Sequence, residues 1–171
     1  MKKGLFAFVI GIVVLVGAAV GVGYILPAGH VATHVVHYAV SPDSVWSVIT
    51  DFQSQPRWFS GVRSSIRVAD RNGHPTYRED LDGFKAEMET AEWDPPRRLV
   101  RVVHSENAGF RGSWTWLLAP EGDGTRLTLI EQAEVDNPLF RVMVAMMDET
   151  AMIRTYADAL GARLKVEPLA Q

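Results

Sequence analysis

One long stretch without any charge divides this chain in two. After Lys3, no Asp, Glu, Lys or Arg occurs through position 29, and residues 5–26 form a continuous apolar core of 22 residues. At about 1.5 Å per residue, a helix of that length is roughly 33 Å long, which is enough to cross the hydrocarbon of a bilayer. The sequence therefore predicts a cytoplasmic stub and transmembrane anchor in residues 1–29, followed by a separate domain in residues 30–171.

A cleavable signal peptide is the alternative interpretation of this segment. The apolar core of a signal peptide is about 7–15 residues long and ends in a small-x-small site. This core is longer and ends in the sequence YILP at positions 24–27, which favours an uncleaved, single-pass anchor. Lys2 and Lys3 precede the core, and the next basic residue is Arg57. The positive-inside rule then puts the N-terminus in the cytoplasm and the following domain outside it, in the periplasm if the protein is bacterial.

The composition limits what the second part of the chain can bind. The chain has 17 Lys and Arg, of which only Lys2 and Lys3 precede the domain, against 20 Asp and Glu. A mildly acidic domain without a basic patch is not expected to bind nucleic acid. The chain has no cysteine, which excludes disulfides, thiolate chemistry and cysteine-based zinc sites. Residues 30–171 are enough for one domain with its own hydrophobic core.

Turn signals at short intervals predict the fold of residues 30–171. A strand rich in β-branched residues, VATHVVHYAV, comes first. A short helix follows, with Ser41 as its N-cap and Pro42 in its first turn, and a second short helix is expected around Pro56. Six further strands are then separated by the turn sequences RNG, DG, PP, NAG and EGDG. Strands in succession joined by short turns predict an antiparallel meander.

One long helix is expected to close the fold. Asn137 is its predicted cap and Pro138 its first residue. Apolar residues then recur at three- and four-residue steps as far as Leu164, which gives a stripe some 26 residues long. A helix of that length has to lie across a whole sheet to bury the stripe.

Three of the five histidines, His30, His34 and His37, lie close together near the start of the domain. On a helix they would share one face and could bind a metal ion. On a strand, His34 and His37 point to opposite faces, and the run of valines around them favours the strand. We therefore expect no metal site here.

Three segments of the domain are distinctive in both order and spacing. They are SPDSVWSVITDFQSQPRWFSGV, EWDPPRRLVRVV and WTWLLAPEGDGTRLTLIEQAEV. They resemble the START and birch-pollen-allergen superfamily, in particular its polyketide cyclase/dehydrase and lipid-transport (SRPBCC) branch, with its capped Val-Trp helix, Pro-Pro turn and Gly-x-Gly-Thr hairpin. The resemblance covers about residues 31–166. The N-terminal anchor departs from the family, most of whose members are soluble.

The resemblance implies an α+β helix-grip fold. In that fold a seven-stranded antiparallel curved sheet wraps around a long C-terminal helix, and a ligand cavity lies between them. Family members use the cavity for lipids, polyketides, hormones or protein partners, and few share a catalytic motif. The resemblance therefore predicts the fold more specifically than it predicts the function.

Strand alternation within this fold selects the residues of the cavity wall. Inner positions are mostly apolar with a few polar groups, as in ordinary ligand pockets, and methionines of the long helix are expected opposite them. In RRLVRVVHS the inner set is taken to be Val100, Val102 and His104. The expected ligand-binding residues are Tyr77, Glu79, Met88, His104, Trp114, Trp116, Glu131, Met143, Met146 and Met147, with Trp58 at the pocket mouth.

A purely structural role is the alternative for several of these residues. Glu79 could point past the rim, the tryptophan pair could belong to the core, His104 could face solvent, and Trp58 could anchor its loop. Glu131 is harder to explain in this way, because a carboxylate between apolar neighbours in mid-strand needs a partner or a raised pKa.

Three functions are compatible with these observations. The one we favour is a membrane-anchored binding or carrier domain for a hydrophobic small molecule or lipid. The second is a cyclase/dehydrase-type enzyme in which His104 and a carboxylate, Glu131 or Glu79, perform acid–base chemistry. No nucleophile, metal-ligand or phosphate-loop motif supports an enzyme, so no catalytic residue, metal or cofactor is assigned. The third is a ligand-free protein-interaction module, which leaves a protein partner as an open alternative.

Overall fold

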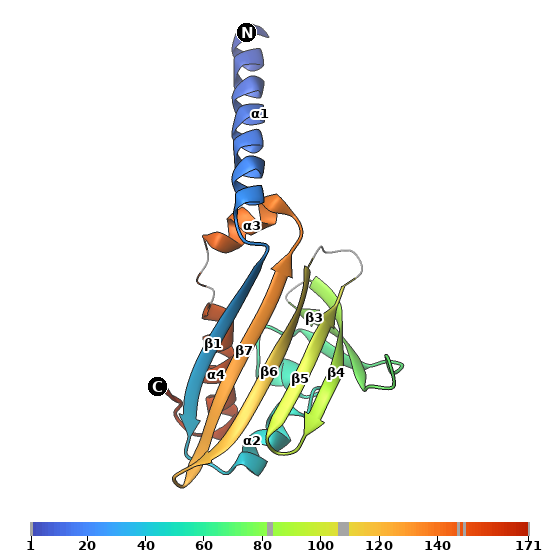
Figure 1. Ribbon diagram of the computed structural model, residues 1–171, viewed down its shortest axis with the longest axis vertical. Helices are drawn as coiled ribbons and strands as arrows, with labels where there is room; N and C mark the ends of the chain where they lie inside the picture. The colour runs from blue at the N-terminus through green and yellow to red at the C-terminus, as the bar shows by residue number, and fades with distance from the viewer. Residues whose placement is uncertain (1, 82–83, 106–109, 147, 149, 171) are drawn as a thin grey trace.

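The computed structural model consists of a long N-terminal helix and an α+β domain (Figure 1). The structure describes residues 2–81, 84–105, 110–146, 148 and 150–170. The turns expected at positions 82–83 and 107–109 lie outside these residues.

Helix α1 (Lys2–Ile25) projects away from the domain at one end (Figure 1). Its helical conformation agrees with the expectation for residues 5–26. Within the described part of the chain, no helix combines the length and the apolarity needed to cross a membrane. The membrane crossing of this segment therefore stays a prediction.

The domain is built on one antiparallel sheet, as expected. Seven strands alternate in direction in the order β2-β3-β4-β5-β6-β7-β1, and a two-residue strand, β8 (Leu169–Ala170), pairs with the free edge of β1. Strand β1 pairs with β7 along its whole length, which brings the first strand next to the last long one. The seven strands are β1 (Gly29–Tyr38), β2 (Ser64–Arg67), β3 (Thr76–Leu81), β4 (Phe84–Asp94), β5 (Arg98–His104), β6 (Phe110–Glu121) and β7 (Gly124–Val135).

The short helices follow their sequence signals. Helix α2 (Pro42–Ile49) has Ser41 as its N-cap, and the Ser41 hydroxyl accepts a hydrogen bond from the Ser44 backbone N–H at 3.4 Å. A single 3₁₀ turn, η1 (Gln55–Arg57), contains Pro56. The RNG signal forms a tight hairpin turn in which Asn72 and Gly73 both have positive φ, of 53° and 79°.

The predicted single long helix is instead two helices, α3 (Pro138–Ala145) and α4 (Ala151–Leu164). Asn137 caps α3, since its side-chain oxygen accepts from the Leu139 N–H at 2.9 Å. The second helix has a start signal of its own. The Asp148 carboxylate accepts from the Thr150 N–H at 2.9 Å and from the Thr150 hydroxyl at 2.8 Å, which fixes the turn directly before α4.

Of these two helices, only α4 covers the sheet. Its buried residues Ile153, Ala157 and Leu160 pack against inner side chains of β1, β5 and β7, such as Leu127. Full burial of each large aliphatic side chain contributes roughly 1.5–3 kcal/mol. The Tyr38 hydroxyl donates to the Ala157 carbonyl oxygen at 2.7 Å, which fastens α4 to β1. By contrast, α3 has no buried residue and lies across the foot of α1 (Figure 1).

Candidate functional site

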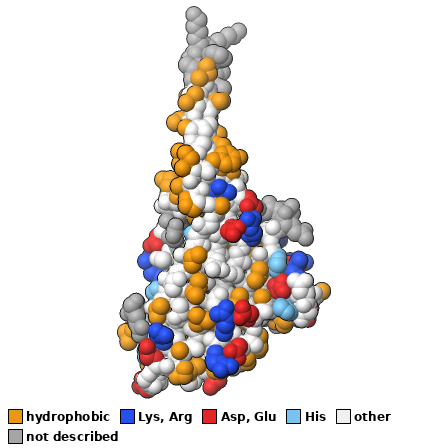
Figure 2. All heavy atoms as spheres, in the orientation of Figure 1, with side chains coloured by type: hydrophobic (Ala, Val, Ile, Leu, Met, Phe, Trp, Pro, Cys, Tyr) orange, Lys and Arg blue, Asp and Glu red, His pale blue; other side chains and the backbone are white. Residues whose placement is uncertain are grey.

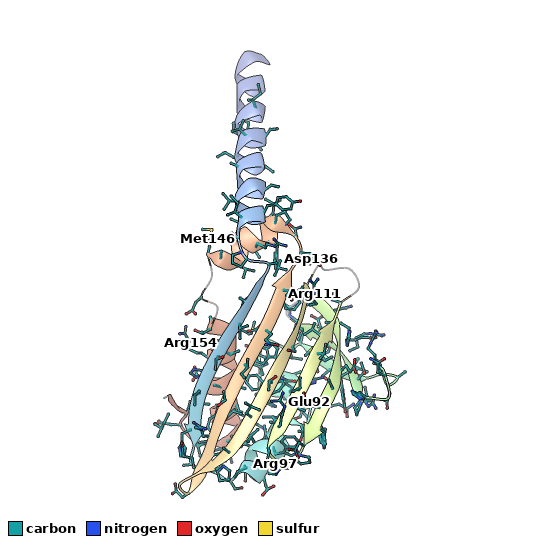
Figure 3. All side chains as sticks on the ribbon, viewed as in Figure 1. Glu92, Arg97, Arg111, Asp136, Met146 and Arg154 are labelled. Carbon is teal, nitrogen blue, oxygen red and sulfur yellow. The ribbon has the colours of Figure 1, made fainter. Side chains whose placement is uncertain are left out.

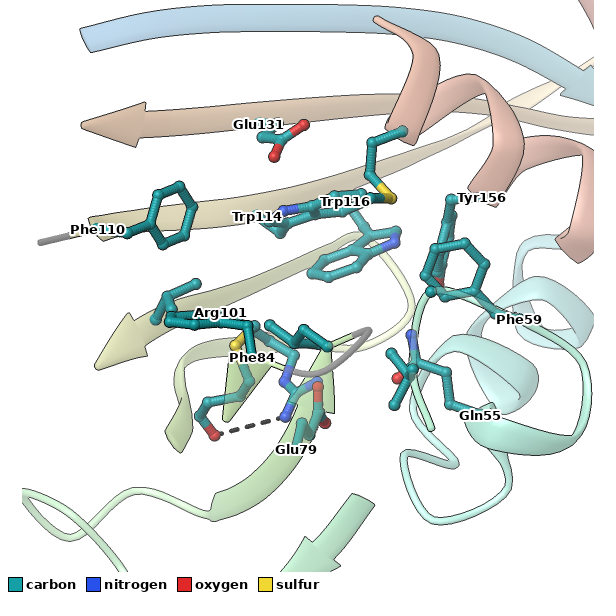
Figure 4. A pocket seen from close by; sticks show the side chains of 16 residues that line it. Gln55, Phe59, Glu79, Phe84, Arg101, Phe110, Trp114, Trp116, Glu131 and Tyr156 are labelled. Atoms are coloured by element: carbon teal, nitrogen blue, oxygen red, sulfur yellow. Dashed lines mark hydrogen bonds and ion pairs between the residues drawn. The ribbon is translucent and has the colours of Figure 1, made fainter. Parts of the chain in front are cut away.

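A cavity of about 200 Å³ lies between the concave face of the sheet, the start of α4 and the segment after α2 (Figure 4). Most of its wall is apolar. The aromatic side chains that line it are Phe59, Phe84, Phe110, Trp114, Trp116 and Tyr156. Four polar residues complete the wall, and these are Gln55, Glu79, Arg101 and Glu131. A largely apolar concave site with a few polar groups is typical of a small-molecule pocket.

A buried ion pair forms one side of the cavity. Arg101 Nη1 lies 2.9 Å from Glu79 Oε1, and each of the two side chains is only 2% exposed. Ser65 donates a hydrogen bond to the same Glu79 oxygen at 3.0 Å. The Arg101 guanidinium also donates to the Met88 carbonyl oxygen at 3.4 Å and stacks 3.9 Å from the centre of the Phe52 ring. Both charges are thus compensated inside the protein, as buried charges must be.

Two lining residues carry a buried polar atom with no hydrogen-bond partner in the described part of the chain. These atoms are Gln55 Oε1 and Arg101 Nε. A buried polar atom without a partner is costly, so this acceptor and this donor are suited to polar atoms of a ligand. Burial raises the pKa of Tyr156, so its hydroxyl is neutral at physiological pH, even though a hydrogen bond from the Trp116 indole and the Arg101 charge oppose the shift.

Glu131 lies in mid-strand on β7, where sequence alternation predicted an inner carboxylate. It pairs across the strands with Trp114 of β6. Burial raises the pKa of Glu131 to about 7, and a hydrogen bond from the Trp114 indole limits this rise. At neutral pH the carboxyl group is therefore divided between its protonated and ionised forms. It can donate a hydrogen bond in the first form and accept one in the second.

Three aromatic rings form a continuous wall beside Glu131. The rings of Trp114 and Trp116 lie 5.7 Å apart, and Tyr156 of α4 meets them at 5.6 and 5.9 Å. These are normal distances for packed aromatic pairs. The wall is therefore rigid and joins the sheet to α4 directly behind the cavity.

The structure brings five of the predicted ligand-binding residues together at the cavity. They are Glu79, Met88, Trp114, Trp116 and Glu131. Tyr77 lies behind them, with its ring 4.9 Å from that of Phe52. Trp58 also lies behind the wall, 5.4 Å from the Tyr156 ring, and packs against the core there.

His104 lies away from the cavity, and the inner set assigned to β5 was wrong. Arg101 and Val103 line the cavity, whereas His104 belongs to the opposite set and is bound to Glu89. The distance from its Nε2 to Glu89 Oε2 is 2.8 Å. The error arose because both alternating sets of this strand contain apolar residues, and the correct set contains an arginine. The sequence alone did not reveal that this arginine has a buried partner.

The helix break explains the misplaced methionines. Met143 and Met146 lie on α3 and its end and are 47% and 85% exposed, away from the cavity. Met147 lies outside the described residues. Met152, in the first turn of α4, lines the cavity instead.

Several lining residues were missed by the sequence analysis. Arg101 was missed because cations on strands usually face water. Tyr156 could have been found, since it lies one turn from Ile153 and Leu160 on the buried face of α4. Gln55 begins the 3₁₀ turn η1 and Phe59 follows it. This turn is too short to show a periodicity, so no pattern indicated where the two side chains point.

Residues 29–165 match the protein family described as polyketide cyclase/dehydrase and lipid transport. The chain belongs to this family. The match begins at the first residue of β1 and includes both α3 and α4. A search of curated proteins gave no match.

Solved structures support the family's fold. A START superfamily protein from Mycobacterium smegmatis is 22% identical, with a TM-score of 0.61 over 80% of this chain and 97% of that one. The Zhui aromatase/cyclase from Streptomyces sp. R1128 is 15% identical, with a TM-score of 0.63 over 80% and 94%. Norcoclaurine synthase from Thalictrum flavum is 13% identical, with a TM-score of 0.62 over 80% and 93%. At these identities the likeness extends to the fold alone.

Proposed function

We propose that this protein is a membrane-anchored binding or carrier domain for a hydrophobic small molecule or lipid, held in the cavity between the sheet and α4. The observation that carries the proposal is the combination of an aromatic wall with buried polar atoms that lack partners, namely Gln55 Oε1 and Arg101 Nε. Membership of a family described by polyketide cyclisation and lipid transport supports the same class of ligand.

The volume of the cavity limits the size of the ligand that fits inside it. A volume of about 200 Å³ exceeds the roughly 150 Å³ that accommodates benzene in an engineered cavity. It is smaller than the roughly 300–1,000 Å³ of pockets for drug-sized ligands. The ligand part inside the cavity is therefore about one or two rings, or the end of a longer chain. An oxygen on it would accept from Arg101 Nε, and a hydroxyl would donate to Gln55 Oε1.

The anchor rests on the sequence of residues 5–26. This segment has no charge and directly precedes the family domain. With its two N-terminal lysines in the cytoplasm, the cavity would lie beside the outer surface of the membrane. Hydrophobic ligands concentrate in bilayers, so a tethered cavity would meet them at high local concentration.

The test begins with mass spectrometry of the full chain, purified in detergent and extracted with organic solvent. A reproducible copurified lipid or aromatic compound is the expected result. Binding of 2-naphthol, as a two-ring probe with one hydroxyl, would then be compared between the native chain and Gln55→Met, which removes the unpaired acceptor. Loss of one neutral hydrogen bond should weaken binding about two- to tenfold. Gln53→Met is the matched control, because Gln53 is exposed and lies outside the cavity.

An empty chain that binds neither extracted lipids nor the probe would overturn this proposal. It would instead favour the third possibility, a protein-interaction module. Equal weakening of probe binding in Gln53→Met and in Gln55→Met would show that the probe binds at the surface rather than in the cavity.

A cyclase/dehydrase-type enzyme is the second candidate, and one observation favours it. A general acid or base works best when its pKa is near the operating pH, and Glu131 meets that condition inside an aromatic pocket. The expected partnership of His104 with Glu131 or Glu79 is not formed, because His104 is bound to Glu89 outside the cavity. Any acid–base chemistry would therefore depend on Glu131. The decisive measurement is turnover of an extracted ligand by the native chain and not by Glu131→Gln.

A further inference from the structure

Helix α3 exposes apolar side chains that nothing in the described part of the chain covers. Its sequence is PLFRVMVA, with one charged residue in eight, and none of its residues is buried. The exposed fractions are 44% for Leu139, 41% for Phe140 and 47% for Met143, and Met146 at its end is 85% exposed. A helix that is apolar around most of its circumference is normally buried. An exposed apolar surface of this kind marks an interaction site.

The single charge of α3 is turned back toward the domain. Arg141 Nε donates to the Val135 carbonyl oxygen at 2.7 Å, and its Nη2 donates to the Asp136 carbonyl oxygen at 3.3 Å. The guanidinium thus binds the end of β7. The surface of α3 that faces away from the domain is left to apolar side chains, and Met146 points outward there (Figure 3).

This apolar surface is continuous with α1. The two helices meet so closely that a Cβ added to Gly23 would lie 2.0 Å from the Pro138 carbonyl oxygen. Tyr24 and Ile25, at the end of α1, are themselves 70% and 86% exposed. Hydrophobic side chains gather along α1 and around its foot in Figure 2, whereas charged side chains spread over the domain below. Helix α3 crosses the foot of α1 rather than running along it (Figure 1).

We propose that α3 docks in the lipid–water interface of the membrane that α1 enters, with Leu139, Phe140, Met143 and Met146 inserted among the lipids. The proposal rests on the anchor proposed above. If α1 runs along the membrane normal, then α3, which crosses its foot, lies in the membrane plane, the orientation of an interfacial helix. Arg111 fits the adjacent polar layer, because it pairs with Glu134 and Asp136 just below α3 (Figure 3).

Docking of α3 would also orient the cavity. Strand β7 runs from the cavity to α3, and Glu131 lies only four residues before its end at Val135. Phe84 and Phe110, which begin β4 and β6, line the cavity, and their rings pack 5.9 Å apart. This end of the cavity is the one nearest α3, so an interfacial α3 brings it toward the lipid from which a hydrophobic ligand would enter.

The test uses the absence of cysteine, which allows a single label to be introduced. The full chain would be placed in phosphatidylcholine vesicles as Met143→Cys, Tyr24→Cys or Ser47→Cys, each labelled with an environment-sensitive fluorophore. Lipids carrying a nitroxide near the headgroup would then be added as quenchers. We expect the labels at positions 143 and 24 to be quenched severalfold more than the label at position 47, which lies exposed on α2 at the far end of the domain.

Each pattern of quenching has a distinct meaning. A quenched label at position 24 with an unquenched one at 143 would overturn the docking of α3 and leave the anchor intact. No quenching at either position would overturn the anchor and the docking together. If the label at 143 is shielded, and the shielding disappears when labelled chains are diluted with lipid, a second copy of the chain covers α3 and the lipid proposal is wrong.

Discussion

Glu131 shows what a single buried carboxyl group costs this fold. Its pKa of about 7 in the folded chain lies above the roughly 4.3 of an unfolded glutamate. The folded state therefore binds more protons than the unfolded state between these two values. The contribution of the Glu131 carboxyl group to stability is fully present below the unfolded pKa. It is lost as the pH rises from that value through the folded pKa. A shift of this size corresponds to about 3 kcal/mol.

We therefore expect Glu131→Gln to remove most of this pH dependence. The neutral amide resembles the protonated acid, so the variant should be more stable than the native chain at pH 8, by up to about 3 kcal/mol, and similar to it at pH 4, below the pKa of the unfolded glutamate. The measurement is the free energy of unfolding in urea at both pH values. Glu92→Gln is the control, since the exposed Glu92 has a pKa lowered by Arg98. Parallel pH profiles for the native chain and Glu131→Gln would contradict the prediction.

For the Glu79–Arg101 pair, we expect removal of one charge to destabilise the fold, whereas at Glu131 removal of the charge is expected to stabilise it. Replacing Arg101 with Met leaves the Glu79 charge buried without its main partner, which should destabilise the fold by roughly 3–5 kcal/mol. Adding Glu79→Gln to that variant removes the uncompensated charge and should restore a large part of the loss. Urea unfolding of the two single variants and the double variant forms the cycle. A double variant as unstable as the sum of its singles would show that the two charges do not act as a pair.

These two sites also show how far sequence reasoning reaches at single residues. Glu131 was predicted to face inward because apolar residues flank it at alternate positions on its own strand. Arg101 was not, because its compensation comes from Glu79, which lies 22 residues earlier on another strand. The alternation of residues along one strand shows which face a side chain occupies. It does not show which residue of another strand will pair with it.

At the scale of elements, the C-terminal region shows the same limit. The apolar periodicity from Leu139 to Leu164 correctly predicted helical structure. Such periodicity does not show whether the helix is continuous. The break depends on hydrogen bonds of Asp148 to Thr150, and Asp is an ordinary residue on the polar face of a helix. The strands were easier to predict, since Gly, Pro or Asn separates most of them in the sequence.

Two substitutions at the starts of the helices should separate α3 from α4 by experiment. Asp148→Ala removes two hydrogen bonds in the turn before α4, and because α4 covers the core, it should lower the free energy of unfolding by about 0.5–1.5 kcal/mol. Asn137→Ala removes the α3 cap, and because α3 buries no side chain, it should leave global stability nearly unchanged while amide exchange in α3 speeds up. Equal losses of global stability in both variants would mean that the two helices form one cooperative unit.

At the scale of the whole molecule, the core and the cavity belong to the sheet, α2 and α4, and α1 lies outside both. Helix α1 meets the rest of the chain where Gly23 lies against Pro138 of α3. Strand β1 begins at Gly29 and is held by β7 along its length, so its place in the sheet does not depend on the helix before it.

Removal of residues 1–26 should therefore leave the domain folded. We expect its melting temperature to stay within a few degrees of that of the full chain in detergent, because no core contact is lost. Amide exchange should rise in α3, which loses the helix it lies against, and stay unchanged in α4. A large fall in melting temperature would mean that α1 and α3 stabilise the core through the end of β7.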